Sequence, residues 1–255
     1  MIEAFGRTDV GRRRKLNEDS FLVAPESHLY AVCDGMGGHN AGEVASRIAV
    51  ETLASFVEKS AAEKDITWPW GLDADLSFEA NRLKTAIRLA NSQVYQSADS
   101  DEELTGMGTT VVATIVSGNT LSIGSAGDSR CYLVREGQLQ QLTQDDSWVS
   151  AALGEGILNS DDVERHPLRN VITKAVGARD SIDLEIVEQT LQEGDIALLC
   201  SDGLHGMVGD GEIARLLIPD PDSLEDAATH LVDAANEAGG KDNVTVILMR
   251  YSDKG

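Results

Sequence analysis

The most constraining feature of this sequence is a set of acidic residues that stand where short apolar runs begin or end, most of them beside glycine. Such runs predict interior strands, and an ionised carboxylate at the end of an interior strand needs a hydrogen-bonding partner or a cation. The five sites are Glu18-Asp19, Asp34-Gly35, Gly127-Asp128, Asp202-Gly203 and Asp242. One Asp-Gly pair alone is typical of a turn, but five sites at strand ends indicate a metal site.

The chemistry of this set favours hard divalent cations. Carboxylate and carbonyl oxygens suit Mg²⁺ or Mn²⁺, whereas zinc sites use histidine and cysteine at characteristic spacings. The sequence has neither an HExxH motif nor a set of His and Cys residues at such spacings. Cys33, Cys131 and Cys200 lie far apart among apolar neighbours, which predicts buried, reduced thiols.

The charge balance supports the same interpretation. The 255 residues include 43 Asp and Glu against 21 Lys and Arg, a formal net charge of -22. A field of this sign repels nucleic acid and anionic membrane surfaces and attracts cations. We therefore expect no nucleic-acid partner and no membrane partner. The charge by itself is equally explained by solubility, so the positions of the acids carry the argument rather than their number.

The order of predicted elements indicates layers. Hydrophobic periodicity predicts helices from about Gly42 to Lys59, around Leu83 to Val94, and from Asp226 to Ala238. Predicted strands cover Phe21 to Val23, Leu29 to Cys33, Thr110 to Val116, Thr120 to Ser125, Arg130 to Val134, Ile196 to Cys200 and Val244 to Met249. Strands and helices do not alternate, which excludes a doubly wound sheet and favours sheets packed inside helices. No change in composition marks a boundary, so we expect one domain over residues 1–255.

Residues 145–180 are loosely patterned and are predicted to run over the surface, as long functional or mobile loops do. The apolar stretches are too short to cross a bilayer, and the N-terminus lacks the apolar core of a secretory signal. We expect a cytoplasmic protein.

Six short motifs occur along the chain, and five of them contain these acidic residues. They are Arg14-x-x-Asn17-Glu18-Asp19, Asp34-Gly35-Met36-Gly37-Gly38, Gly108-Thr109-Thr110, Gly127-Asp128-Ser129-Arg130, Ser201-Asp202-Gly203-Leu204 and Gly240-Lys241-Asp242-Asn243. Together they resemble the type 2C protein phosphatases, the metal-dependent PPM family, in its compact bacterial form. Each motif alone is weak, but the resemblance covers nearly the whole chain. It implies an α+β fold, a four-layer α-β-β-α sandwich with two central antiparallel sheets.

The resemblance also implies roles for single residues. Asp34 would bridge two Mn²⁺ or Mg²⁺ ions, Asp202 and Asp242 would complete the first, and the Gly35 carbonyl and Glu18 would serve the second. Asp128, with Asp202, matches the site of a weaker third ion. Asp19 would orient the waters bound to the ions, Asn243 would lie next to the ligands without binding an ion, and Arg14 would bind the substrate phosphate. Residues 145–180 match the flap beside the cleft. Hydrolysis would proceed by attack of a water held between the two ions.

One position departs from the family pattern. Many eukaryotic members carry a histidine directly after the Asp-Gly pair, proposed to protonate the leaving alkoxide, and this chain has Met36 there. His39 lies three residues on, and its placement near a predicted helix start favours an ordinary polar role. The identity of the general acid is open.

The expected function is a phosphatase that hydrolyses phosphoserine and phosphothreonine in proteins. The expected partners are phosphorylated proteins, substrates of a Hanks-type serine/threonine kinase, and the chain is expected to be a monomer. The alternatives are a phosphatase of a small phosphorylated regulator such as an anti-sigma antagonist, a hydrolase of small phosphate esters, and a non-catalytic relative that only binds phosphoproteins. The presence of Asp34, Asp202 and Asp242 argues against the last of these.

Overall fold

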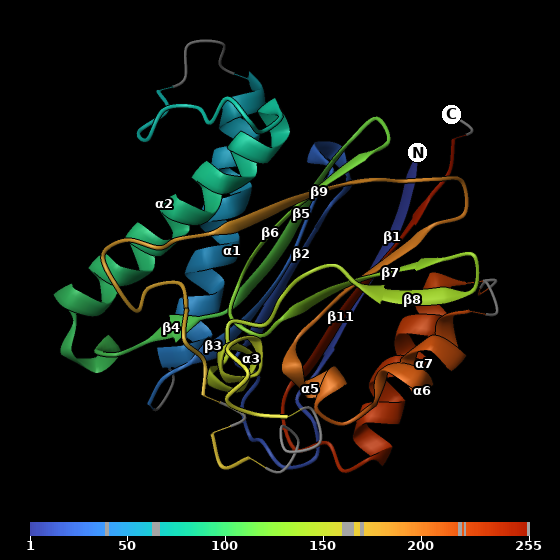
Figure 1. Cartoon of the computed structure of the whole chain (residues 1–255). Coiled ribbons are helices and arrows are strands. Elements are labelled where there is room, and N and C mark those ends of the chain that lie inside the picture. The colour runs from blue at the N-terminus through green and yellow to red at the C-terminus, as the bar shows by residue number, and fades with distance from the viewer. Residues whose placement is uncertain are drawn as a thin grey trace.

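Two antiparallel sheets form the central layers of the molecule (Figure 1). The structure is a computed structural model, and it describes residues 1–38, 41–62, 67–159, 166–168, 171–218, 221 and 223–253. The first sheet has the order β1 (Ile2–Asp9), β11 (Val244–Tyr251), β10 (Ile196–Cys200), β7 (Arg130–Arg135), β8 (Gln138–Gln141). The second has the order β2 (Asp19–Ala24), β3 (Leu29–Met36), β5 (Val111–Ser117), β6 (Thr120–Ala126), β9 (Glu185–Thr190), and the short β4 (Gly108–Thr109) pairs with β3.

Helices cover the outer face of each sheet. The helices α1 (Ala41–Ala62) and α2 (Phe78–Ser100) pack against the second sheet. The helices α5 (Asp202–His205), α6 (Asp210–Leu217) and α7 (Leu224–Glu237) pack against the first (Figure 1). Among the described residues, connections between strands and helices also contain the helices η1 (Pro25–Ser27), η2 (Glu102–Leu104) and α3 (Trp148–Gly154). The predicted four-layer α-β-β-α sandwich is therefore confirmed.

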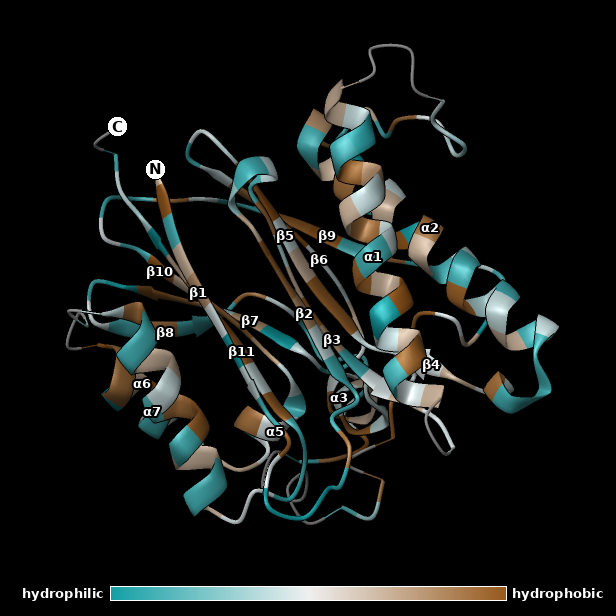
Figure 2. Cartoon of the chain, turned by 180° about the vertical axis from the view of Figure 1, so that it is seen from behind, coloured by the Kyte–Doolittle hydropathy of each residue, from teal (hydrophilic) through white to brown (hydrophobic). Residues whose placement is uncertain are grey.

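Strand alternation explains why the layers stack in this order. Along β3, Leu29, Ala31 and Cys33 face α1 and α2, whereas Tyr30 and Val32 face the other sheet. Successive side chains of a strand point to opposite faces, so a strand covered on both sides is apolar throughout. Figure 2 shows this as apolar colour along the central strands and mixed colour along the helices. The core between the sheets joins them through buried side chains of β3, β5, β6, β7, β10 and β11.

The sequence analysis missed β1, β8, β9 and α6. The strands β1, β8 and β9 lie at sheet edges, where only one side is paired. Their side chains are mostly half-buried or exposed, so polar residues interrupt the apolar pattern on which the prediction relied. Among the described residues, no helix is long and apolar enough to span a membrane.

The antiparallel arrangement brings the acidic positions to one end of the sandwich. In the second sheet, Asp19 at the start of β2 pairs in register with Asp34 near the end of β3. In the first sheet, β10 ends just before Asp202, and its neighbours β7 and β11 both begin at that edge, after Asp128 and Asp242. In Figure 1 this end lies at the bottom of the view, beside α5 and α3.

Candidate metal and phosphate site

Hydrogen bonds to Thr109 and Thr110 fix the backbone of Asp34. Its N–H donates to the Thr110 hydroxyl at 3.0 Å, and its carbonyl accepts from the Thr110 N–H at 2.8 Å and the Thr109 hydroxyl at 2.9 Å. The next residue must be glycine, because a Cβ on Gly35 would collide with backbone atoms of Gly42 and Glu18. This close packing fixes the backbone from which the Asp34 carboxylate projects.

The carboxylates of Asp19, Asp34, Asp128, Asp202 and Asp242 lie close enough to repel one another, and we call them the acidic cluster. Burial, followed by repulsion from Asp19, Asp202, Asp128 and Asp242, raises the pKa of Asp34 well above its usual value. Burial and the charge of Asp242 raise the pKa of Asp202 to about 6. Carboxylates held this close disfavour one another's ionisation. The cluster is therefore stable when some of its carboxylates are protonated or when a cation lies among their oxygens.

Asp19 ties the two sheets together behind the cluster. Its Oδ2 accepts hydrogen bonds from the Ser201 hydroxyl at 2.8 Å, directly after β10, and from the Thr245 hydroxyl at 2.6 Å, in β11 of the other sheet. Its Oδ1 is buried and has no hydrogen-bond partner in the described structure. Burial raises the pKa of Asp19 to about 7 in spite of the two hydroxyl donors. Asp19 therefore joins the two sheets next to the other carboxylates, and its supporting role stays a prediction.

Arg14 lies at the rim of the cluster. Its Nη2 donates to Asp242 Oδ2 at 2.7 Å, and its Nη1 lies 3.8 Å from Glu18 Oε2. The hydrogen bond to Asp242 is the main reason that the pKa of Arg14 is raised. The side chain remains 47% exposed, so the guanidinium is accessible from solvent. Arg12 and Arg13 are also exposed, and neither forms an ion pair with Asp242 or Glu18 in the described structure.

Asn243 fixes the loop that carries Arg14. Its side-chain amide donates to the carbonyls of Val10 at 3.0 Å and Leu16 at 2.8 Å, and its Oδ1 accepts from the Glu18 N–H at 2.8 Å. Asn243 is 3% exposed. One buried amide therefore holds both ends of the Arg14 loop against the start of β11.

The donor set fits hard cations. The buried oxygens Glu18 Oε1 and Asp202 Oδ1 have no hydrogen-bond partner in the described structure, and each is an anionic oxygen that a cation would satisfy. Glu18 itself lies beside Gly42 at the start of α1, and burial raises its pKa. Among the described residues, no three His, Cys, Asp or Glu side chains are already gathered as a complete set of ligands for one ion. Asp242 is instead turned towards Arg14.

A pocket of about 590 Å³ opens beside the cluster. Asp128, Asp202 and Asp242 line it together with Arg130 and Lys241. Burial, then repulsion from Asp202 and Asp145, raises the pKa of Asp128 to about 7. The pocket therefore has an acidic floor at the position predicted for a third ion.

Two residues of this pocket were missed by the sequence analysis. Arg130 forms a forked pair with Asp145, with Nε to Oδ1 at 2.9 Å and Nη2 to Oδ2 at 2.7 Å, and also donates to Tyr132. His205 Nε2 lies 2.9 Å from the Asp128 carbonyl oxygen, and burial lowers its pKa to about 4. The sequence offered one signal, the Arg130 that ends the Gly127-Asp128-Ser129-Arg130 motif. Nothing in the local sequence marks His205.

The predicted flap begins and ends on anchored residues. The Asp146 N–H donates to the Gly127 carbonyl at 2.8 Å, Lys174 pairs with Asp146 at 2.8 Å, and Ser147 forms a β-bridge with Ile172. Between them, Trp148 stacks on His166 with ring centroids 4.8 Å apart. Residues 160–165 and 169–170 lie outside the described residues, as does His39 of the general-acid question.

Sequence comparisons match this chain to known proteins over most of its length. The sequence model of protein phosphatase 2C matches residues 10–248. The serine/threonine phosphatase stp of Listeria welshimeri is 36% identical over 250 residues, which cover 95% of this chain and 93% of that protein.

The fold is also that of solved phosphatases. The serine/threonine phosphatase PstP of Mycobacterium tuberculosis superposes with a TM-score of 0.85 at 34% identity, covering 98% of this chain and 99% of that chain. A structure of the PstP catalytic domain in complex with two manganese ions has a TM-score of 0.84 at 34% identity, and 99% of each chain is covered.

Proposed function

The chain belongs to the protein phosphatase 2C family, and on this premise we propose how its residues hydrolyse phosphoserine and phosphothreonine in proteins. Its relatives are serine/threonine protein phosphatases, and the chain is a metal-dependent enzyme of that type. The observation that carries the residue assignments is the convergence of Asp34, Asp202 and Asp242 at one end of the sandwich with unpartnered carboxylate oxygens beside them.

We assign the cation ligands from this cluster. Asp34 would hold both of two Mn²⁺ or Mg²⁺ ions, Asp202 and Asp242 would complete the ligands of one, and the Gly35 carbonyl and Glu18, the latter largely through bound water, would serve the other. Asp128 lies where it can serve a weaker third ion with Asp202. When bound, the ions would neutralise charge and activate a water for attack on the phosphate. A structure of the related PstP contains two manganese ions, which supports two ions here.

The chain's own residues bind and orient the substrate. Arg14 stands at the open rim with a forked set of donors that can hold two oxygens of a phosphate monoester. A phosphate bound there would compete with Asp242 for the Arg14 guanidinium, and the Asp242 carboxylate would then be available to hold a cation. Asp19 and Asn243 fix the two loops that meet at this point, so the reacting phosphate and the acidic cluster keep one relative position.

We further propose that the chain works as a single catalytic domain over residues 1–255, as a cytoplasmic monomer that reverses a Hanks-type serine/threonine kinase, with residues 145–180 as its flap. The shared core between the two sheets supports one domain. The three buried free cysteines suit a reducing compartment. The net charge of -22 opposes self-association.

A phosphopeptide assay tests the proposal. We expect hydrolysis of a phosphothreonine peptide with added Mn²⁺, loss of that activity in EDTA, and its return on adding Mn²⁺ in excess. The Asp34→Asn enzyme should retain its fold and lose nearly all activity, because the shared ligand loses its charge. Full activity in EDTA, or a near-normal rate for Asp34→Asn, would refute the site.

A further inference from the structure

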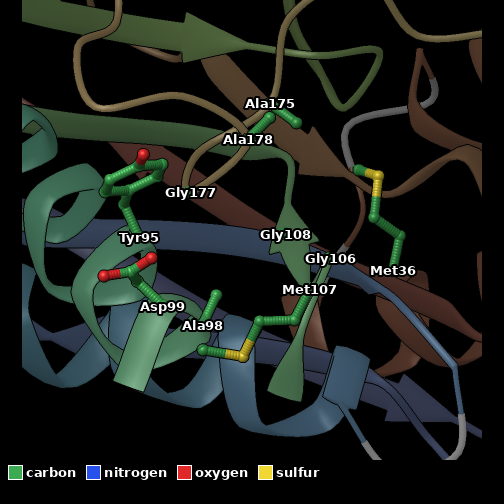
Figure 3. A pocket seen from close by; sticks show the side chains of 10 residues that line it. All are labelled: Met36, Tyr95, Ala98, Asp99, Gly106, Met107, Gly108, Ala175, Gly177 and Ala178. Atoms are coloured by element: carbon green, nitrogen blue, oxygen red, sulfur yellow. The ribbon is translucent and has the colours of Figure 1, made fainter. Parts of the chain in front are cut away.

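A second pocket of about 310 Å³ shares no lining residue with the pocket of Asp128 (Figure 3). It begins at Met36, two residues beyond Asp34, and ends at Tyr95 and Asp99 on α2. Figure 3 shows Tyr95 and Asp99 on one side of it and Met36 on the other. We call it the α2 groove. None of the residues assigned to cations or to the substrate phosphate lines it.

The walls of the α2 groove are rigid and are built onto the Asp34 frame. One wall is Met107 and Gly108, which continue into the Thr109 and Thr110 that hold the Asp34 backbone. The opposite wall, residues 175–178, is bonded to the first through the paired N–H and carbonyl groups of Thr109 and Val176, at 3.0 and 2.8 Å. The groove and the acidic cluster therefore keep a fixed relative position.

The α2 side of the groove is equally fixed. The Gly177 N–H donates to Asn91 Oδ1 at 2.8 Å, and Asn91 Nδ2 donates to the Arg179 carbonyl at 3.0 Å. Asn91 is 1% exposed. A surface loop pinned in this way loses little conformational freedom when a chain binds to it, which favours binding.

The lining of the α2 groove has a definite chemical character. Apolar side chains cover most of it, and two of them are methionines, which adapt to partners of different shape. Tyr95 is 37% exposed and offers an aromatic face, and among the described residues of the lining only Asp99 has an acidic side chain. Asp99 is exposed, and within the described structure it forms no hydrogen bond or ion pair with its carboxylate. A carboxylate beside an aromatic face at the end of an apolar groove suits a basic side chain.

We propose that the α2 groove binds the segment of the substrate protein that flanks the phosphorylated residue, with an apolar side chain in the groove and a Lys or Arg at Asp99. The inference rests on the proposed function, and it adds a sequence preference to it. The groove starts at Met36, two residues from Asp34. A substrate segment whose phosphate lies at the acidic cluster can therefore extend into the groove without a conformational change of the enzyme. Asp99 then selects, by charge, among segments that all fit the groove.

The test compares phosphopeptides that differ only in having Lys or Glu at one position on either side of the phosphothreonine. With the native enzyme we expect a higher kcat/KM for Lys at one position or at two neighbouring ones. The expected ratio is about two- to fivefold, the usual size of a solvent-exposed ion pair. Asp99→Lys should reverse the ratio at those positions only and leave the hydrolysis of an aryl phosphate unchanged.

A matched control separates local from general electrostatics. Glu102→Lys changes the net charge equally, three residues away and outside the groove, and should leave the ratio as in the native enzyme. An unchanged ratio in Asp99→Lys, or an equal change in Glu102→Lys, would overturn the proposal, since the second result is what the field of the whole molecule produces.

A second variant tests the groove without altering charge. Ala178 is exposed, so Ala178→Trp fills the groove with little effect on folding. It should lower kcat/KM for phosphopeptides about tenfold and leave aryl phosphate hydrolysis and Tm near the native values. Equal effects on both substrates would count against the groove. An enzyme that hydrolyses the aryl phosphate but no phosphopeptide would refute the proposed function itself, whereas active enzyme without any flanking preference refutes only this inference.

Discussion

The proposed role of Arg14 is to bind the substrate phosphate, and substitution of this one side chain can test it. Its guanidinium is exposed, faces the acidic cluster, and already contacts Asp242 at 2.7 Å. We expect Arg14→Ala to raise KM for a phosphopeptide about ten- to hundredfold with a smaller effect on kcat, as loss of a charge-assisted contact to bound substrate does. Arg14→Lys should recover only part of this, because an ammonium cannot hold two oxygens as a fork does.

The neighbouring arginine provides the control for that measurement. Arg13 is exposed and adjacent in sequence, so Arg13→Ala removes the same charge from the same loop. Its steady-state constants should match those of the native enzyme within about twofold. A larger effect for Arg13→Ala than for Arg14→Ala would show that the phosphate lies against a different part of the loop.

The buried carboxylates predict an unusual dependence of stability on pH in the metal-free protein. The pKa of Asp19 and of Asp128 is raised to about 7 and that of Asp202 to about 6, so the folded state binds more protons than the unfolded chain. Stability from these groups is present below pH 4 and is lost as the pH rises through 6 and 7. His205 acts oppositely, because its pKa is lowered to about 4 and its contribution is lost as the pH falls below 6.5.

Between pH 6 and pH 8 the carboxylates dominate this balance. One pKa unit corresponds to about 1.4 kcal/mol, so we expect the free energy of unfolding in EDTA to fall by roughly 1–3 kcal/mol over that range. Chemical denaturation at both pH values measures it. With saturating Mn²⁺ the fall should shrink or reverse, because cations bind the ionised carboxylates. Greater stability at pH 8 than at pH 6 in EDTA would contradict the assigned crowding.

At the scale of elements, β7 has an arginine–aspartate ion pair at each of its two ends, so one can serve as the control for the other. Arg130 at its start forks onto Asp145, the first residue of the proposed flap, and Arg135 at its end contacts both oxygens of Asp195 with Nε and Nη2. We expect Arg130→Lys and Arg135→Lys each to lower stability by about 1–2 kcal/mol through loss of the fork. Only Arg130→Lys should also lower kcat/KM for phosphopeptides, because only that pair joins the flap to the Asp128 pocket. Similar losses of activity in both variants would show that stability alone is responsible.

The same scale shows why the sequence predicted some elements and missed others. Interior strands such as β3, β10 and β11 are covered on both faces, so their residues are apolar throughout and were recognised. The edge strands β1 and β9 mix polar and apolar residues, and their pairing comes from partners far along the chain. The extent of α2 was also underestimated, since Ser77 caps a start that lies before the recognised periodicity.

The sequence likewise predicted some residues of the candidate site and missed others. Its carboxylates were found because strand ends and glycines mark them locally. The hydroxyl groups that hold Asp19 were not found, because Ser201 and Thr245 lie 182 and 226 residues away and are ordinary strand-end residues in sequence. His205 was missed for the same reason, since only the fold places it against the Asp128 carbonyl.

At the scale of the whole molecule, metal binding and global stability are one equilibrium. Ions that bind the folded state and not the unfolded chain add about 2.7 kcal/mol for each site at a concentration one hundred times its Kd. For a chain of 255 residues, 1 kcal/mol shifts Tm by about 2–4 °C, so Mn²⁺ should raise Tm by at least about 5 °C above its value in EDTA.

Ionic strength must be separated from site binding, because a chain with a net charge of -22 is stabilised by any salt that screens its self-repulsion. NaCl at equal ionic strength is therefore the reference, and it should reproduce only a small part of the shift. Asp34→Asn should remove most of the Mn²⁺ response and leave the NaCl response intact, whereas Asp99→Asn, in the α2 groove, should change neither. If NaCl gave the full shift, or Asp34→Asn kept the full Mn²⁺ response, the strand-end carboxylates would be a charged surface feature and not the ligands of the enzyme's ions.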